Sequence, residues 1–285
     1  MRKLLVCLVM VMFIFPLTVH AQSTASYYVK ADGNDDDNDG LSELWPLQSL
    51  SWALCLAQLT SIKKITVIGT LDVRSESATK GAGFILGDFS QGKNTSEIII
   101  TGKPNVSSVD RAVLSGLGLG AGVLAIIDIK IRLEHIEISG GEGEQGNGIE
   151  LGGAATLTLG TGTVVRRNQG IGLVIVDDGS SAILDGGEIR ENNKGGVLLG
   201  KGSFAMRSGS INSNNDSGIG VVGGGVFTMS GGTISGNSAG DVGGGVYVSS
   251  GCTFNQTGGA ISNNTAKRGS NPNIFRAVGA LGANL

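Results

Sequence analysis

Apolar and polar residues alternate in short segments through most of this chain, and the segment Phe227–Val248 (FTMSGGTISGNSAGDVGGGVYV) shows the pattern best. In the four residues that begin with Phe227 every second side chain is apolar, and further along Tyr247 lies between two valines. A period of two is typical of strands that bury one face. The pattern therefore predicts short half-buried strands, separated by glycine-rich bends in which a side chain would not fit.

The same alternation recurs along the sequence at a nearly constant spacing. Each copy is followed directly by an aliphatic residue. The copies are Leu157–Thr163 (LTLGTGT), Ala182–Glu188 (AILDGGE), Phe204–Ser210 (FAMRSGS), Phe227–Thr233 (FTMSGGT) and Phe254–Ala260 (FNQTGGA). Their starts lie 25, 22, 23 and 27 residues apart, and a fainter copy starts at Ile131. Periods of this length indicate a repeat architecture in which each unit stacks on the next.

A repeat of this size has room for about three short strands with their turns, and almost none for a helix. When such coils stack, each strand pairs with its equivalent in the next coil, about 4.8 Å away. The predicted fold class is therefore all-β, a right-handed single-stranded parallel β-helix. Two columns of side chains are expected inside it: Phe204, Phe227 and Phe254 in one, and Leu159, Leu184, Met206 and Met229 in the other.

A polar residue follows the aliphatic position of each copy by three residues. It is Arg167 in the first copy, and in the others it is Asn192, Asn214, Asn237 and Asn264. A carboxamide both donates and accepts hydrogen bonds. We therefore expect the four asparagines to form an internal ladder at one corner of the coils, bonded to one another and to the turn backbone.

These repeats resemble those of a known group of proteins. The pattern GG-x-I-x-x-N-x-A-x(4)-GGGVY-V is similar to the glycine-rich repeats of pectate-lyase-like β-helix proteins, in particular to polymorphic outer-membrane protein and adhesin-like repeats on bacterial surfaces. The GGAI element of those repeats ends here at Ile261. Their phenylalanine three residues before the asparagine is replaced by isoleucine, as at Ile234. In fold the resemblance covers Tyr27–Ala266, and the likeness to surface repeats covers the last third of that span.

The first residues have the features of a signal peptide. Arg2 and Lys3 precede the apolar run Leu4–Leu17, and cleavage is expected after Ala21; the alternative is an N-terminal anchor helix. We therefore expect residues 1–21 to direct secretion by the general pathway to the periplasm, the outer-membrane surface or the extracellular space. No transmembrane segment is expected in the mature chain. Loss of the two basic residues changes the net charge from −3 to −5, which argues against a nucleic acid partner.

The remaining chain divides into a cap, a solenoid and a tail. Residues 22–62 are predicted to form an N-terminal cap of a strand, an acidic turn and a helix over Leu47–Leu59, which would cover the open end of the first coil. Further strands are expected at Leu124–Ile131 among others, and a loop at Gly81–Lys93. The parallel β-helix is expected over residues 63–266, with regular coils from 131 to 266, and residues 267–285 form a C-terminal tail.

The acidic turn of the cap is a candidate metal site. Asp35, Asp37 and Asp39 have the spacing that opens a calcium-binding loop, and alternating carboxylates can converge on one hard cation. An EF-hand would also need a bidentate glutamate where this chain has Pro46. A solvated acidic turn is the favoured interpretation and a calcium-stabilised cap the alternative. No other cofactor is expected.

The chain could contain catalytic residues, because the proteins that it resembles include enzymes that cleave polysaccharides. Hydrolysis of an acidic glycan needs paired carboxylates with supporting basic groups. Asp177 and Asp178 are the adjacent acidic pair of the regular coils, but the expected companion motifs are missing from the sequence. His135 is interpreted as a surface residue. We therefore predict no catalytic residues, and a polysaccharide lyase or hydrolase acting on a glycan such as pectin is the alternative.

An outward apolar column is the predicted binding surface. With Val176, Leu199 and Val248 assigned to the interior, the column consists of Ile175, Leu198, Val221 and Tyr247. An exposed stripe of this kind indicates contact with a glycan, a protein ligand or another copy of the chain, or cover by the segment Asn271–Leu285. The expected function is therefore a non-catalytic, adhesin-like binding or structural role at the bacterial surface.

Overall fold

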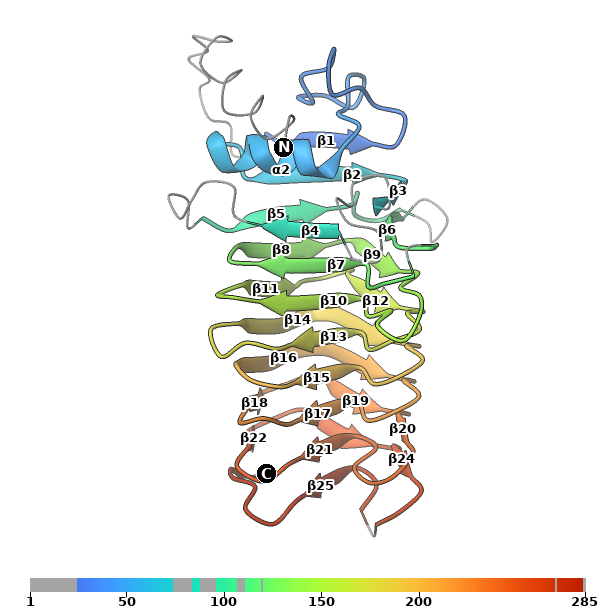
Figure 1. The fold of residues 1–285 in the computed structure, drawn as a ribbon, viewed down its shortest axis with the longest axis vertical. Coiled ribbons are helices and arrows are strands. Elements are labelled where there is room, and N and C mark those ends of the chain that lie inside the picture. Colours follow the sequence, from blue (N-terminus) through green and yellow to red (C-terminus); the bar gives the residue numbers. More distant parts are fainter. Residues whose placement is uncertain are drawn as a thin grey trace.

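The computed structural model describes residues 25–73, 84–87, 96–106, 111–118, 120–269 and 271–283. These residues form an elongated parallel β-solenoid with one helix near the N-terminal end (Figure 1). The predicted all-β right-handed parallel β-helix is confirmed at the level of fold class. The expected signal peptide lies outside the described residues. Within the described ranges no helix is long and apolar enough to cross a membrane.

Three parallel ladders, here called the first, second and third faces, run along the solenoid. The first face contains β1 (Tyr27–Lys30), β2 (Lys64–Ile68), β5 (Ile98–Thr101), β8 (Lys130–Glu134), β11 (Thr156–Leu159), β14 (Ser181–Arg190), β16 (Ser203–Asn212), β18 (Val226–Met229) and β22 (Thr253–Gln256). The second contains β3 (Thr70–Asp72), β6 (Ala112–Ser115), β9 (Ile136–Ser139), β12 (Val164–Arg166), the second halves of β14 and β16, β19 (Thr233–Ser235) and β23 (Ala260–Ser262). The third contains β4 (Phe84–Gly87), β7 (Leu124–Ile127), β10 (Ile149–Gly152), β13 (Leu173–Ile175), β15 (Val197–Leu199), β17 (Ile219–Val221), β21 (Val246–Val248) and β25 (Ile274–Arg276). Two short strands, β20 (Ser238–Ala239) and β24 (Thr265–Ala266), pair with each other in a separate small sheet.

Glycines form the bend between the first and second faces. The long strands β14 and β16 pass through this bend, and their pairing shifts register around Asp185. Gly209 has a φ of +91°, and a Cβ there would lie 2.2 Å from the carbonyl oxygen of Gly187. No side chain can occupy that space, so the glycine-rich bends that the sequence predicts are a steric requirement.

The predicted interior columns are both present. The ring centroids of Phe204 and Phe227 are 5.6 Å apart and those of Phe227 and Phe254 are 4.7 Å apart, with nearly parallel planes in the second pair. The second column pairs in the expected order, residue on residue: Leu159, Leu184, Met206 and Met229. All of these side chains are buried. The solenoid interior is therefore filled by columns in which similar side chains stack from one coil to the next.

The asparagine ladder is also present, and each of its members is buried. The Oδ1 of Asn214 accepts hydrogen bonds from the backbone N–H and the Nδ2 of Asn192, at 3.1 and 3.0 Å. The Nδ2 of Asn214 donates to the Oδ1 of Asn237 at 2.9 Å and to the carbonyl oxygen of Ile189 at 3.2 Å. Every polar atom of the side chain therefore has a partner, which is what burial of a carboxamide requires.

The ladder is longer than the sequence indicates. Asn168 precedes Asn192, and its Nδ2 donates to the Oδ1 of Asn192 at 3.0 Å, so Asn168 and not Arg167 is the member from that coil. The reason is register: Val165, not Val164, pairs with Ile189. At the other end the Oδ1 of Asn273 accepts from Asn264.

A column of glycines makes room for the ladder. A Cβ on Gly218 would lie 2.8 Å from the Nδ2 of Asn237 and 2.8 Å from the Cγ2 of Ile234. The corresponding glycines in the neighbouring coils are equally crowded by the ladder asparagine and the isoleucine beside it: Gly148 (where the aliphatic neighbour is a valine), Gly172, Gly196 and Gly245. The ladder and the glycines that precede β10, β13, β15, β17 and β21 are thus parts of one packing arrangement.

The cap helix is shorter than predicted. Helix α2 covers Leu50–Leu59, because the extended Ser49 is its N-cap and accepts a hydrogen bond from the backbone N–H of Trp52. Leu47 lies before the helix and forms a parallel bridge with Val29 of β1. The Asp35 carboxylate holds this junction: it accepts from the backbone N–H groups of Gln48 and Ser49 and from the Ser49 hydroxyl.

Two predictions for the early coils are wrong. The expected single strand Leu124–Ile131 is divided into β7 and β8 by a corner at Asp128, whose φ is +57°. Within the predicted loop Gly81–Lys93, residues Phe84–Gly87 form β4, which pairs with β7. The rest of that loop lies outside the described residues. In the segment 124–131 apolar residues continue on both sides of Asp128, and residues 84–86 form a short isolated apolar segment. The hydrophobic pattern alone therefore does not show where the chain turns.

The predicted tail completes the last coil. Strand β25 pairs with β21, and Leu281 forms a parallel bridge with Thr253 of β22. The guanidinium of Arg276 lies 5.0 Å from the centroid of the Phe254 ring, and its Nη2 donates to the Phe254 carbonyl oxygen at 2.8 Å. The segment 271–283 therefore covers the end of the phenylalanine column, and the solenoid continues beyond residue 266.

Replacing Asn214 with leucine should lower the free energy of unfolding by about 1 to 3 kcal/mol, because Asn192 loses the acceptor of two hydrogen bonds in a buried site. Chemical denaturation of the purified protein measures the change. Asn215→Leu is the matched control, since Asn215 is exposed and lies next to the ladder. Equal stability of the two variants would show that the ladder is not a significant source of stability.

Replacing Asp35 with alanine should destabilise the cap by about 1 to 3 kcal/mol, since two backbone N–H groups and a hydroxyl lose their acceptor. Hydrogen exchange of the amides in α2 reports the effect locally. Asp36→Ala is the control, because Asp36 is exposed and its side chain makes no hydrogen bond within the described residues. Unchanged protection of α2 in Asp35→Ala would contradict the capping role.

Candidate functional site

The predicted binding column is wrong by one residue in two of its coils. Ile175 and Val221 are 0% exposed and pair with Leu199 and Val248 in an inward column. Val176, assigned to the interior from the sequence, is 49% exposed and follows the end of β13. Since successive side chains on a strand point to opposite faces, a slip of one residue reverses the assignment.

The observed outward column differs in composition from the predicted one. Leu198 and Tyr247 belong to it as expected, and both are half-buried. Strand pairing places these residues in line, from the N-terminal to the C-terminal coil: Ile85, Ala125, Glu150, Val174, Leu198, Gly220, Tyr247 and Phe275. The column is apolar over most of its length, and a glycine interrupts it between Leu198 and Tyr247.

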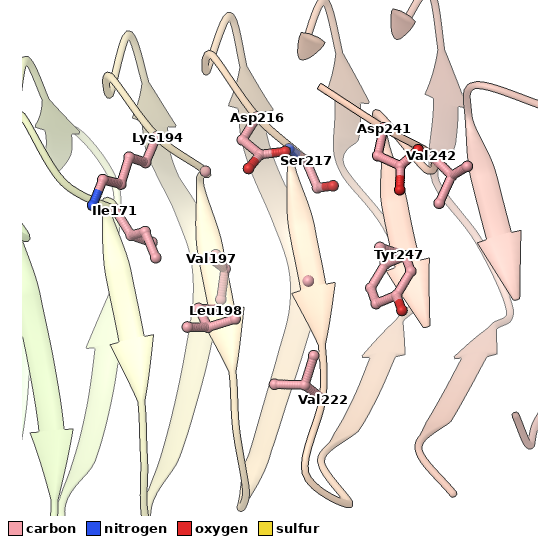
Figure 2. Close-up of a pocket in the computed structure, with 12 residues that line it drawn as sticks. Ile171, Lys194, Val197, Leu198, Asp216, Ser217, Val222, Asp241, Val242 and Tyr247 are labelled. Atoms are coloured by element: carbon pink, nitrogen blue, oxygen red, sulfur yellow. The ribbon is translucent and has the colours of Figure 1, made fainter. Parts of the chain in front are cut away.

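A groove of about 350 Å³, here called the third-face groove, lies over this part of the column (Figure 2). Leu198, Gly220 and Tyr247 form its apolar centre. Polar residues gather along one edge, on the loops that lead into the strands: Lys194, Asp216, Ser217 and Asp241. The arrangement combines an apolar surface with hydrogen-bonding groups along one side, which is typical of ligand sites.

The charged groups at the edge are partly engaged with their surroundings. The Lys194 ammonium donates to the carbonyl oxygen of Glu144 at 2.9 Å. Asp216 accepts from the backbone N–H of Ser217 at 2.8 Å, and Asp241 lies 3.7 Å from the guanidinium of Arg268. Two carboxylates and two cations therefore meet at this edge, and its formal charge is zero.

Tyr247 is half of an aromatic pair. Its ring lies parallel to that of Phe275, with centroids 5.6 Å apart and an interplanar angle of 4°. Phe275 lies in the segment interpreted from the sequence as a tail, so the pair was not predicted. The apolar pair Ile274 and Phe275, directly after the asparagine at 273, is the signal that would have indicated one more strand.

The acidic turn holds its carboxylates in separate local contacts. Asp35 binds the start of α2, Asp37 accepts from the Nδ2 of Asn34 at 2.8 Å, and Asp39 accepts from the backbone N–H of Leu41 at 2.9 Å. Asp37 and Asp39 border one hollow together with Trp45. Among the described residues no three histidine, cysteine, aspartate or glutamate side chains are close enough to hold one metal ion. Calcium binding stays a prediction from the sequence.

The candidate catalytic groups have structural contacts. Asp177 accepts a hydrogen bond from the backbone N–H of Gly153 at 2.7 Å, which joins two successive turns. His135 occupies a corner with a φ of +50°, and its backbone N–H donates to the carbonyl oxygen of Thr161. In the following coils Gly200 and Val222 lie in line with Val176 and not with Asp177.

A cluster of ion pairs on the second face was not predicted. Arg166 binds Glu137 at 2.9 Å, Arg190 binds Glu188 at 2.9 Å, and Glu191 lies beside them. Glu137 is only 7% exposed, and its hydrogen bond raises the pKa of the Arg166 guanidinium. Each carboxylate faces an arginine and not a second carboxylate, whereas glycoside hydrolysis uses two carboxyl groups on either side of the substrate. The cluster therefore has the character of a surface ion-pair network.

Comparisons with models of protein families, with curated proteins and with solved structures found no match. The fold itself is the similarity that the structure supports: a parallel β-solenoid consistent with the pectate-lyase-like β-helix.

Proposed function

We propose that this chain is an exported, non-catalytic β-helix protein that binds a partner at the bacterial surface through the third-face groove. The export and the surface location rest on the signal-peptide pattern of residues 1–21 and on the likeness of the later repeats to adhesin-like repeats. The compartment is the extracellular space, the outer-membrane surface or the periplasm.

The observation that carries the proposal is the outward apolar column that ends in an open groove beside Tyr247 and Phe275. Both rings are half-buried although they lie on the outside of the solenoid. A rigid aromatic side chain with an accessible edge offers apolar area and a hydroxyl at a low entropic cost on binding. The corresponding outward column of the first face is mixed and mostly polar: Lys130, Thr156, Ser181, Ser203 and Val226.

Cover of this column by the tail does not explain it. Residues 274–276 continue the third face as β25, in line with β21, and do not lie across it. Phe275 covers one side of the Tyr247 ring and leaves the groove open. The partner is therefore sought outside the segment 271–283, as a glycan, a protein or a second copy of the chain.

Substitution of Tyr247 by serine should reduce retention of the purified mature protein on intact source cells about tenfold or more, since an aromatic anchor of this kind contributes on the order of 2 kcal/mol. Labelled protein bound to washed cells is the measure, with sedimentation to detect self-association. Tyr28→Ser is the control, because Tyr28 is half-buried on the outside of β1, far from the groove. Retention that is the same for Tyr247→Ser and wild type would overturn the proposal.

The alternative function is cleavage of an acidic polysaccharide, and it predicts that the protein releases unsaturated uronides from pectin. We expect no release of unsaturated uronides when the purified protein is incubated with pectin in the presence of calcium, because Asp177 and the nearby Asp128 each accept a hydrogen bond from the backbone of the turn at Gly153 and Ala154. Absorbance of the unsaturated product measures the reaction. Release that disappears in Asp177→Asn would establish the enzyme and refute the non-catalytic proposal.

A further inference from the structure

The glycine in the middle of the outward column is not required by the fold. A Cβ on Gly220 would meet only the Cδ1 of Leu198, at 3.6 Å, which is an ordinary van der Waals contact. Its φ is not in the left-handed region, unlike that of Gly223 nearby. Gly218, two residues earlier, is crowded by the asparagine ladder and cannot carry a side chain. The space outside Gly220 is therefore a vacant position in an otherwise continuous column.

The vacancy has the thickness of one flat ring. Gly220 pairs with Leu198 on one side and with Tyr247 on the other. Neighbouring strands are about 4.8 Å apart, so the backbones that bear Leu198 and Tyr247 are separated by about 9.6 Å along the solenoid. An apolar contact needs about 4 Å on each side. One ring fits between them in contact with both, and a second does not.

The Tyr247 ring presents a free face to this slot. Its other face is stacked on Phe275, which belongs to the following coil. Since the two rings are parallel within 4°, the uncovered face of Tyr247 is directed along the solenoid toward the coil of Gly220. In Figure 2 Leu198 and Tyr247 lie on either side of the strand that leads to Val222, which is β17, the strand of Gly220. Phe275 thus holds the tyrosine ring in an orientation suited to stacking.

The edge of the slot supplies hydrogen-bond acceptors. Asp216 and Ser217 precede Gly220 in the same coil, and Asp241 precedes Tyr247. A carboxylate has about four lone-pair sites, so the single bond from the Ser217 backbone leaves Asp216 able to accept more. A group that stacks on an apolar face and donates several hydrogen bonds from its rim satisfies both features. A pyranose ring has this character, with C–H groups on one face and hydroxyls around the edge.

The carboxylates of Asp216 and Asp241 at the polar edge of the groove favour a neutral sugar over an acidic one. Lys194 and Arg268 balance the two carboxylates, and both cations are directed to partners of the chain. A uronate in the slot would place a further negative charge beside Asp216, whose carboxylate forms no ion pair within the described residues. A neutral sugar has no such cost.

We propose that the slot at Gly220, between Leu198 and Tyr247, binds one ring of a neutral oligosaccharide, whose hydroxyls donate hydrogen bonds to Asp216 and Asp241. This inference rests on the proposed function, because it names the ligand class of the same groove. An extended glycan would run along the third face, with further sugars over the neighbouring coils.

The test uses the purified mature protein and a panel of neutral hexose and N-acetylhexosamine oligosaccharides, with oligogalacturonides for comparison. Binding is measured by calorimetry for those that bind on an array. We expect a neutral ligand to bind, Gly220→Leu to weaken it at least about tenfold by filling the slot, and the melting temperature to be unchanged or higher. Ala125→Leu is the matched control, since it enlarges an outward residue of the same column outside the groove.

Several outcomes would overturn the inference: wild-type affinity in Gly220→Leu, preference for oligogalacturonides, or no binding by any sugar of the panel.

Tyr247→Phe separates stacking from hydrogen bonding and should retain most of the affinity, whereas Asp216→Asn should reduce it. If no sugar binds but Tyr247→Ser still releases the protein from cells, the slot inference fails and the proposed function stands. If Gly220→Leu abolishes sugar binding while Tyr247→Ser remains attached to cells, the groove binds sugar and the proposed role in attachment fails.

Discussion

The solenoid depends on a hydrogen-bonded column at one corner. Each ladder asparagine accepts from the coil before it and donates to the coil after it, so the spacing of the coils and the geometry of the carboxamide must agree at every step. From Asn168 to Asn264, the residue before each ladder asparagine has a positive φ, as Glu191 does at +56°. A buried amide without these partners would be costly, and this requirement ties the corner, the glycines beside it and the strand register together.

The sequence predicts the parts of the fold that repeat and fails where one coil departs from the pattern. The columns of phenylalanine and asparagine follow from residue identity at a regular spacing. Asn168 was missed because two valines in succession hide which one is inward. The predicted binding column is wrong in two coils for related reasons. Residues 173–176 are all apolar and Gly220 has no side chain, so in neither coil does alternation show which position faces outward. Only the pairing with Leu198 and Tyr247 resolves it.

Interior and outward positions of the strands differ in what constrains their residues. Interior positions are constrained by stacking, and their residues vary little in character from coil to coil. Outward positions carry no such constraint, so a cluster of apolar and aromatic residues there needs another explanation. The third-face groove satisfies this criterion, whereas the carboxylates of the cap and of the turn at Asp177 already serve the backbone around them.

The contact of Arg276 with Phe254 has a consequence for how the molecule loses its structure. A stack in which each coil contacts only its neighbours behaves as a one-dimensional array, and such arrays fray from their ends. The arginine closes one terminus by covering the last ring and bonding to its carbonyl oxygen. Tyr247 belongs to the coil directly inside that terminus, through its pairing with Phe275. The groove therefore keeps its shape only while the contact of Arg276 with Phe254 holds the final coil in place. Fraying of that coil would remove the stacking partner of Tyr247 before the interior of the solenoid opened.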